Sequence, residues 1–426
     1  MHGAKRLRSL LRSDRGNVMV VAAACMPLII GAAAIGVDTI QLTLAKRQLQ
    51  RAADSAALAG AYALVQSKSA SAAVDRDLTL NNTNITLSTP RVVENAPTTG
   101  SYAGNTKAVR VVLTASRTTP FMAFFNRSST TVSVEATAAY VYQGQFCMVS
   151  LDNQNTTGIT FSGSTTVNLG CGVATNSTSS AAVSAGGSST IIASPIAAVG
   201  GVPSSSSYAS GTVLLPYSPQ QADPYATLPR TPSPPASCTS VSLDSKNNNP
   251  NDLSTKYAGN SGPFCVTGGV DIKGTTTLAP GTYYIDGGTF SMGAQGSLIG
   301  DGVTIILTSS TPTVSTSFAT FSMQGGAIIN LKAPSTGTYA GVIMYEDPRA
   351  PYGSDKINGN SSSLLQGGLY FPSRSLTFNG NTGMTTTCLQ LVAYQLTFTG
   401  NSDVQNSCPA NSGAHAFDGF FVKLVA

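Results

Sequence analysis

The sequence predicts a mainly β protein with an N-terminal transmembrane or extended α-helix, a small α+β module and a parallel β-solenoid. Three observations lead to this fold class. An uncharged stretch near the N-terminus is long enough to cross a membrane, and an Ala-rich heptad pattern follows it. The rest of the chain alternates short β-type segments with Gly, Ser, Thr and Asn. An antiparallel β-sandwich is the alternative for this last part.

The composition is typical of an exported protein rather than of a cytosolic enzyme. Only 10% of the 426 residues are charged, against about 25% in an average soluble domain. Most of the net charge of +5 comes from Lys5, Arg6, Arg8, Arg12 and Arg15. The remainder is nearly balanced, so no nucleic-acid partner is predicted. Histidine occurs only at His2 and His415, which excludes a His-rich metal site, and no cofactor is expected.

A basic cytoplasmic segment, residues 1–17, precedes a predicted transmembrane helix, residues 18–37. No charge lies between Arg15 and Asp38, and a helix of this length spans about 30 Å, one hydrocarbon core. The positive-inside rule places the N-terminus in the cytoplasm. The predicted anchor residues are Val18, Met19, Val20, Val21, Cys25, Pro27, Leu28, Ile29, Ile30, Ile35 and Val37. A signal peptide cleaved near residues 32–34 is the alternative.

An Ala-rich amphipathic helix, residues 38–64, is predicted to continue the apolar helix directly. Small apolar residues recur there at alternating spacings of three and four, which is a heptad pattern. This seam consists of Leu42, Ala45, Leu49, Ala52, Ala56, Ala59 and Ala63. A discarded signal need not lead into a helical register, so the pattern favours an uncleaved anchor. The seam is expected to pack on the protein's own domain, and self-association through this helix is the alternative.

The stretch RGNVMVVAAACMPLIIGAAAIGVD, followed by KRQLQRAADSAALAGA, resembles the N-terminal region of TadG-like Flp/Tad pilus-assembly proteins. The likeness extends over about Arg15 to Ala61 and includes the Asp after the apolar segment and the run Ala52-Ala53-Asp54. It implies an uncleaved, single-pass anchor in the bacterial inner membrane and a periplasmic or surface-directed body. Other Tad pilus-assembly components would then be partners.

The resemblance does not extend to two features of related proteins. Pseudopilins of the same system carry a Glu five residues after the Gly of their cleavage site, whereas this chain has Val21 after Gly16. A processed, polymerising pilin is therefore not expected. Many TadG-like proteins also carry a von Willebrand-type domain with an Asp-x-Ser-x-Ser metal site. The nearest match, Asp252-Leu-Ser254-Thr-Lys256, lacks the last serine, so no metal site is predicted.

Six of the seven cysteines follow the apolar helix. They are Cys147, Cys171, Cys238, Cys265, Cys388 and Cys408. An even number of cysteines in an exported region predicts disulfides. Sequential pairing, 147–171, 238–265 and 388–408, closes short loops and is preferred among the 15 possible connectivities. Six reduced, buried thiols are the alternative.

Residues 65–145 are predicted to form the small α+β module next to the membrane. Two strand-like runs, AVRVVLTA from Ala108 and TVSVEATAAYV from Thr131, follow the preceding helix. The second alternates apolar and polar residues, as a half-buried strand does. TadG-like proteins have a similar run at this place.

Residues 146–426 are predicted to form the β-solenoid because short motifs recur in them. LTFNGNTG at Leu376 and LTFTGNSD at Leu396 lie 20 residues apart, and ITFSG at Ile159 is a third copy. In stacked rungs, the inward apolar residues would lie on one another, and Gly or Asn would turn the corners.

A second pair of motifs supports the same architecture. TFSMGAQG begins at Thr289 and TFSMQGGA begins at Thr320. However, Asn379-Gly380 also suits a hairpin turn, which keeps the antiparallel sandwich as an alternative. A Pro-rich segment, residues 203–238, cannot be a core strand because proline donates no ladder hydrogen bond. We expect it to be a belt on the solenoid surface, with a flexible linker as the alternative.

The charged residues of the solenoid region concentrate in MYEDPRAPYGSDK. This stretch holds Glu346, Asp347, Arg349, Asp355 and Lys356. Because it also contains two prolines and a glycine, we expect a loop with a solvated face, and no catalytic residue is predicted. The sequence thus predicts a non-enzymatic envelope protein that contributes to Flp/Tad-type pilus assembly, secretion or surface adhesion. The alternative is a membrane-tethered β-helix enzyme that acts on polysaccharide through Glu346 and Asp347.

Overall fold

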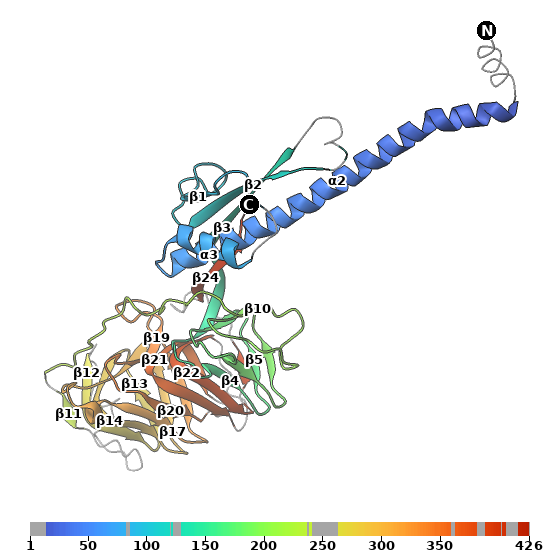
Figure 1. The fold of residues 1–426 in the computed structure, drawn as a ribbon. Helices are drawn as coiled ribbons and strands as arrows, with labels where there is room; N and C mark the ends of the chain where they lie inside the picture. Colours follow the sequence, from blue (N-terminus) through green and yellow to red (C-terminus); the bar gives the residue numbers. More distant parts are fainter. Residues whose placement is uncertain are drawn as a thin grey trace, which may run out of the picture. The chain divides into compact units, whose positions relative to one another are not determined.

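The computed structural model of the chain (Figure 1) divides into two compact units. The residues that it describes are 14–81, 86–119, 121, 129–236, 238–240, 263–358, 363–380, 388–401, 403–405 and 416–425. The N-terminal unit comprises Met1–Val141 and Val422–Ala426, and the C-terminal unit comprises Tyr142–Phe421. The division falls inside a continuous strand, β3 (Thr130–Ser150). The boundary predicted from the sequence is at residue 145. No loop marks the boundary in the sequence, because it lies within a strand.

Two helices form one layer of the N-terminal unit. The long helix α2 (Asp14–Val65) runs for 52 residues through the predicted anchor and the Ala-rich segment without a break. The short helix α3 (Ala70–Leu80) begins after Ser69, whose hydroxyl accepts a hydrogen bond from the Ala72 N–H at 3.3 Å. This side-chain cap satisfies one of the first free N–H groups of α3.

The second layer of this unit is an antiparallel sheet. Strand β2 (Ala108–Arg117) pairs with β1 (Val92–Asn95) on one side and with β3 on the other. Its inward residues, such as Val109 and Val111, are fully buried against the Ala-rich part of α2. The layers are very close, because a Cβ atom added to Gly60 would lie 2.9 Å from Cγ1 of Val109.

The C-terminal unit consists mainly of β-strands, most of which are short. They are β4 (Ile159–Phe161), β5 (Thr166–Asn168), β6 (Gly172–Thr175), β7 (Val183–Ala185), β8 (Thr190–Ile192), β9 (Ile196–Ala198), β10 (Leu214–Leu215), β11 (Thr239–Ser240), β12 (Phe264–Ile272), β13 (Thr275–Leu278), β14 (Gly281–Met292), β15 (Ser297–Asp301), β16 (Val303–Thr308), β17 (Thr320–Met323), β18 (Ile328–Lys332), β19 (Val342–Glu346), β20 (Gly353–Ile357), β21 (Leu364–Gly380), β22 (Cys388–Gly400) and β23 (Asp403–Gln405). A 3-10 turn, η2 (Ser315–Ser317), precedes β17, and β24 (Phe417–Leu424) leads back to the N-terminal unit.

Successive turns of the chain stack through parallel pairing. The pairs β12–β14, β14–β16, β16–β19, β19–β21 and β21–β22 are all parallel. Two further stacks, β13–β15–β18 and β14–β17–β20, run beside them. This is the arrangement expected of a parallel β-solenoid. The mainly β, parallel fold class is confirmed, and the pairing of these strands does not fit the antiparallel sandwich.

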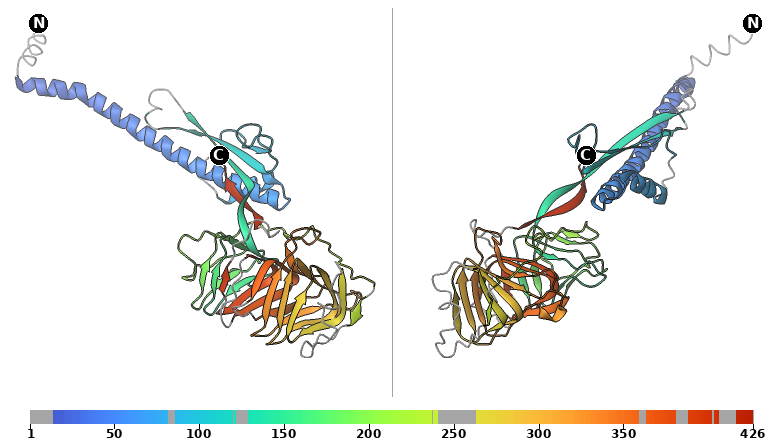
Figure 2. Two further views of the ribbon diagram at one scale, coloured as in Figure 1. Left: turned by 180° about the vertical axis from the view of Figure 1, so that it is seen from behind. Right: turned by 90° about the vertical axis from the view of Figure 1, so that its left-hand side faces the viewer.

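The order of the rungs in space differs from their order in the chain. The last long strand, β22, pairs in parallel with β3 and β4, which belong to the first rung. From β3 the stack continues through β6 and β9 to β10. Figure 2 accordingly shows the orange and red strands between the green strands and the yellow ones. The chain thus travels from β10 at one end of the stack to β11 and β12 at the other.

The repeated sequence motifs lie on one another in the stack. Leu376 is in register with Leu396, and Leu396 is in register with Ile159. The three copies of the motif are therefore neighbours although one lies more than 200 residues earlier. Thr289 and Thr320 of the second motif are in register as well. The corner glycine Gly163 has a φ of +73°, and a Cβ there would lie 2.8 Å from the Gly400 carbonyl oxygen.

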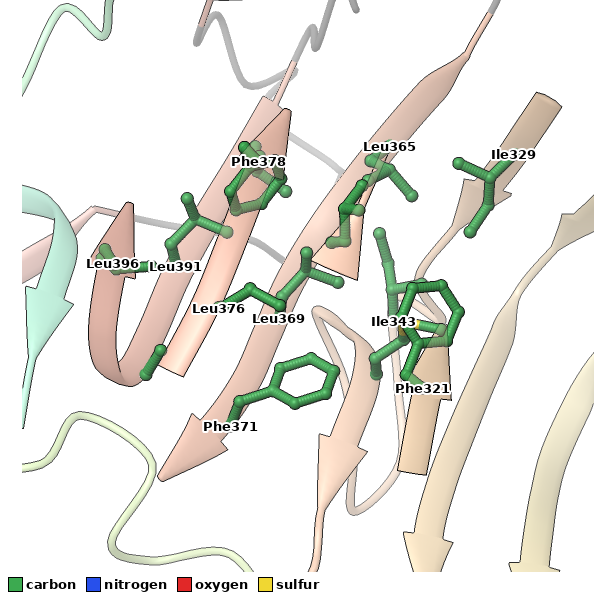
Figure 3. Close-up of a cluster of buried hydrophobic side chains, with 14 of the residues drawn as sticks. Phe321, Ile329, Ile343, Leu365, Leu369, Phe371, Leu376, Phe378, Leu391 and Leu396 are labelled. Atoms are coloured by element: carbon green, nitrogen blue, oxygen red, sulfur yellow. The ribbon is translucent and has the colours of Figure 1, made fainter. Parts of the chain in front are cut away.

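The interior of the stack is filled by rows of large apolar side chains. Figure 3 shows part of this core, with side chains from β17 to β22 in contact. The Phe398 ring stacks between Phe378 and Phe161, with ring centroids 5.1 and 5.3 Å away. Each inward residue thus packs on its equivalent in the next rung, which is how a solenoid buries a continuous core.

The Pro-rich segment between β10 and β11 lies along the outer side of the stack. The Asn176 side-chain amide, near the first rungs, donates to the Gln221 carbonyl at 2.9 Å. The Tyr345 hydroxyl donates to the Pro229 carbonyl at 2.8 Å, and the Thr308 hydroxyl donates to the Pro232 carbonyl at 3.0 Å. These contacts cross the rungs in sequence, so this segment, which we call the belt, carries the chain from one end of the stack to the other.

Candidate membrane anchor and buried charge cluster

The first part of α2 exposes a continuous apolar surface. Among the described residues, α2 is the helix that is long and apolar enough to cross a membrane, by length and composition. The exposed side chains include Val18, Met19, Val21, Leu28, Ile29, Ile30, Ile35 and Val37, together with Cys25 and Pro27. Val20 belongs to the same helix, but its side chain lies outside the described part. An apolar surface of this extent marks contact with a membrane or another protein.

The Ala-rich seam faces the sheet of its own unit. Leu49, Ala52 and Ala56 are 5% exposed or less, and they pack with the inward residues of β2. Ala45 and Ala63 are also buried, whereas Leu42 and Ala59 are half-buried. The buried part of the seam is therefore occupied inside the unit and is not a free surface for another helix.

The heptad pattern missed a second buried row on the same helix. Ala53, Ala57 and Ala61 are fully buried, because α3 packs beside α2 as the sheet does. The signal was present in the sequence, since these alanines recur at a spacing of four. A heptad seam assumes one contacting neighbour, and here the helix has two.

The described part of the C-terminal unit contains two complete disulfides. Cys147 pairs with Cys171, and Cys238 pairs with Cys265. Both are sequential pairs of the kind that the spacing favoured. Cys388 is also disulfide-bonded, while Cys408 lies outside the described residues. The Cys238–Cys265 bond fixes the end of the belt to β12.

The acidic residues predicted to lie on a solvated loop are buried, so that expectation was wrong. Glu346 ends β19 and Asp355 lies in β20, and they are 1% and 2% exposed. The Arg374 Nε atom lies 2.9 Å from Asp355 Oδ2 and 3.6 Å from Glu346 Oε1. Strands β19, β20 and β21 are neighbours in the stack, which brings these three charges together. The short β20 was missed because the two prolines just before it and the glycine at its start are typical of a loop.

The surroundings of Glu346 in the charge cluster change the pKa of its carboxyl group. Burial raises the pKa of Glu346 well above its ordinary value, and the nearby Asp355 carboxylate raises it further. Arg374 and the Ser373 N–H, which donates to Glu346 Oε2 at 3.2 Å, oppose this increase only in part. A buried carboxyl of this kind is either a structural element or a catalytic acid, and its accessibility decides between them.

A second set of polar groups joins this region to the belt. Asp347 is fully buried, and it accepts hydrogen bonds from Arg349 and from the Thr308 hydroxyl. In the belt, Arg230 contacts the Asp223 carboxylate at 2.9 Å and the Tyr370 hydroxyl at 2.6 Å. Burial, with the Asp223 charge second, raises the pKa of Tyr370. These contacts hold the belt to the stack. They offer no exposed carboxylate pair that could flank a substrate bond.

Comparison with known proteins identifies only the N-terminal part of the chain. Residues 16–63 match the family model described as Putative Flp pilus-assembly TadE/G-like, which confirms the resemblance found in the sequence. No curated protein and no solved structure matches the chain. The matched residues are those of the exposed anchor and its Ala-rich continuation. The nearest sequence to a von Willebrand-type metal site, residues 252–256, lies outside the described residues.

Proposed function

We propose that this protein is a single-pass protein of the bacterial inner membrane that contributes to assembly of a Flp/Tad-type pilus. The observation that carries the proposal is the match of residues 16–63 to the TadE/G-like family model. The same residues form one continuous helix whose first part exposes apolar side chains. A helix with this surface is stable in a lipid bilayer and poorly soluble outside one.

The proposed orientation puts the N-terminus in the cytoplasm and the C-terminal unit in the periplasm or toward the cell surface. Five basic residues lie in the first 15 residues of the chain, before the apolar segment, whereas three, Lys46, Arg47 and Arg51, follow that segment. The positive-inside rule favours the end with the larger basic charge as cytoplasmic. Disulfides in the C-terminal unit support the same orientation, because they persist in oxidising compartments.

The C-terminal unit is proposed to act as a scaffold for assembly, secretion or adhesion rather than as an enzyme. Glu346, Asp347 and Asp355 are each 2% exposed or less, and each has an arginine partner. A polysaccharide chain could reach them only if the surrounding strands moved. A stacked β unit instead offers long outer faces on which a partner protein or glycan can lie.

The decisive experiment measures where the native protein resides and whether its N-terminus is intact. Inner and outer membranes of the source cells are separated, and the protein is weighed without reduction. We expect the full-length mass in the inner membrane, lower by two hydrogens for each disulfide. A soluble species that begins near Ile35 would identify a cleaved signal, and one that begins near Asn17 would identify a pilin leader. Either result would contradict the proposed anchor.

A second experiment separates the scaffold from the alternative of a polysaccharide enzyme. The isosteric variant E346Q/D347N replaces the gene in cells whose pilus formation and envelope polysaccharide are both measured. We expect wild-type pili and an unchanged polysaccharide, whereas deletion of the gene abolishes the pili. Loss of a polysaccharide-cleaving activity in the variant, at normal protein abundance, would favour the enzyme instead.

A further inference from the structure

A small cavity lies in the N-terminal unit between α2 and the end of β2. Its volume is about 270 Å³. The helix lines it with Gln41, Leu44 and Gln48, and the strand end lines it with Arg117 and Thr119. It is close in size to the smallest ligand pockets of proteins. Neither the anchor nor the charge cluster described above includes it.

The cavity begins where α2 would leave a membrane, so this inference rests on the proposed anchor. The apolar segment ends at Val37, and a helix rises 1.5 Å per residue. Gln41 therefore lies about 6 Å beyond the hydrocarbon core and Gln48 about 16 Å beyond it. The headgroup layer occupies roughly 5–8 Å on each side of the core. The end of the cavity lined by Gln41 is thus at the depth of lipid headgroups.

The lining divides into a polar part and an apolar part. Among its described residues, Arg117 carries the only charge, and the amides of Gln41 and Gln48 and the hydroxyls of Thr118 and Thr119 complete the polar part. Leu42, Leu44 and Ala45 form the apolar part. Leu44 is 53% exposed, and Ile40, one turn before it, is 62% exposed. The apolar surface of the anchor thus continues past Asp38 to the cavity.

One hydroxyl in the lining has no partner among the residues that the structure describes. Thr119 is 3% exposed, and its hydroxyl forms no hydrogen bond within that part of the chain. Buried hydroxyls in proteins are nearly always hydrogen-bonded, so an orphaned one needs a reason. A ligand with acceptor oxygens in the cavity would provide that partner.

We propose that this cavity binds the headgroup of an anionic phospholipid from the outer leaflet of the inner membrane. The phosphate would lie at Arg117 and the threonine hydroxyls, where charge-assisted hydrogen bonds favour it. The glycerol and the first methylene groups would follow Leu44 and Ile40 into the bilayer. A lipid fits better than a peptide because the lining combines one cation with leucine side chains that continue the exposed apolar surface of the anchor.

The test uses the full-length protein in mild detergent and native mass spectrometry with added phosphatidylglycerol or phosphatidylcholine of equal chain length. We expect retention of phosphatidylglycerol in preference to phosphatidylcholine. R117Q should weaken phosphatidylglycerol binding roughly tenfold, the effect of losing one charge-assisted hydrogen bond. L44Q, at an exposed position, should weaken binding of both lipids. The matched control is R91Q, which removes an arginine of the same unit that pairs with Asp75.

The variant T119V should weaken phosphatidylglycerol binding without lowering the thermal stability of the lipid-free protein. Removal of an unpartnered buried hydroxyl should leave thermal stability equal or higher without lipid. The same variant should bind phosphatidylglycerol several-fold more weakly. A variant that melts lower without lipid and binds normally would show that Thr119 acts only in packing.

Three outcomes would overturn the proposal. Equal retention of both lipids by wild type and R117Q would show that the cavity does not select a headgroup. Competition by inorganic phosphate as strong as that by phosphatidylglycerol would identify a soluble anion as the ligand. A wild-type dimer without a lipid adduct, which the L44Q substitution dissociates, would identify a second copy of the chain as the occupant of the cavity. If the chain is absent from the membrane fraction, the proposed anchor fails instead, and this is measured separately.

Discussion

The N-terminal unit is packed with small side chains and the C-terminal unit with large ones. Ala52 and Ala56 of α2 are buried against a sheet whose own inward residues include Ala136 and Ala138. The C-terminal core instead has rows of Phe, Leu and Ile on successive rungs. In the first unit two layers approach closely through small residues, whereas in the second the side chains themselves fill the space between the walls.

This difference determines which substitutions each unit should tolerate. A helix that lies close to a sheet has no room for added atoms, so enlargement is costly. A stack filled by aromatic rings leaves a cavity when one is removed, so truncation is costly. The family match is confined to residues 16–63. The small residues of the closely packed helix are thus part of the sequence by which the chain is recognised.

The largest effect is expected from truncation in the C-terminal core. Phe398 is fully buried and stacks between Phe378 and Phe161, at the place where the last rungs meet the first. F398A should destabilise the C-terminal unit by about 3–5 kcal/mol. Hydrogen exchange of the full-length protein, read by mass spectrometry, should show faster exchange in peptides of β4, β21 and β22.

The control for this variant is T397A, which shortens an outward, half-buried residue of the same strand. It should change the stability by no more than about 0.5 kcal/mol. Equal exchange in F398A and wild type would mean that β22 does not close the stack onto the first rung.

Removal of one disulfide should destabilise the C-terminal unit and leave the stability of the N-terminal unit unchanged. Cys147–Cys171 joins β3 to the start of β6 and closes a loop of 24 residues. By the entropy of loop closure, C147A/C171A should lose about 3 kcal/mol. Exchange of peptides from the N-terminal unit should be unchanged. Faster exchange in both units would show that the two are coupled in stability.

Enlargement in the N-terminal unit should have the next largest effect. Ala56 is fully buried against the sheet, so A56L must push the layers apart or adopt a strained rotamer. We expect a loss of about 1–3 kcal/mol in this unit. The matched control is A72L on the exposed side of α3, where a leucine is tolerated by a helix. If A56L is as stable as A72L, the helix does not lie close to the sheet.

Much of the fold could be predicted from the sequence because its signals are local. The anchor is an uncharged helix of sufficient length, and the repeats at Leu376, Leu396 and Thr320 mark stacked rungs. The order of the rungs could not be predicted. The copy at Ile159 lies beside the copy at Leu396, and this pairing depends on the belt returning the chain to the far end of the stack.

The buried charges could not be predicted for a different reason. In the sequence Glu346 and Asp355 stand among prolines and a glycine, which is typical of a solvated loop. Their burial follows from Arg374, which is 19 residues after Asp355 and becomes its neighbour only through the pairing of β20 with β21. A charge can be buried when its partner is buried with it, and one sequence does not reveal that partner.

The smallest expected effect concerns this charge cluster and depends on pH. The pKa of Glu346 is raised in the folded protein, chiefly by burial, so the folded state binds more protons than the unfolded state above about pH 4.3. Stability should therefore fall as the pH rises through the window between the unfolded and folded pKa values. The slope is at most about 1.4 kcal/mol per pH unit.

The variant E346Q tests this expectation because glutamine cannot titrate and can still accept the hydrogen bond from the Ser373 N–H. Thermal unfolding is followed by circular dichroism between pH 4 and pH 8. We expect equal stability at pH 4 and a growing advantage of E346Q as the pH rises. A constant loss at every pH would mean that Glu346 is charged in the folded protein and that its ion pair with Arg374 outweighs its burial. The C-terminal unit would then depend on charge as well as on its stacked rings, whereas the buried core cluster of the N-terminal unit consists of alanine, valine and leucine.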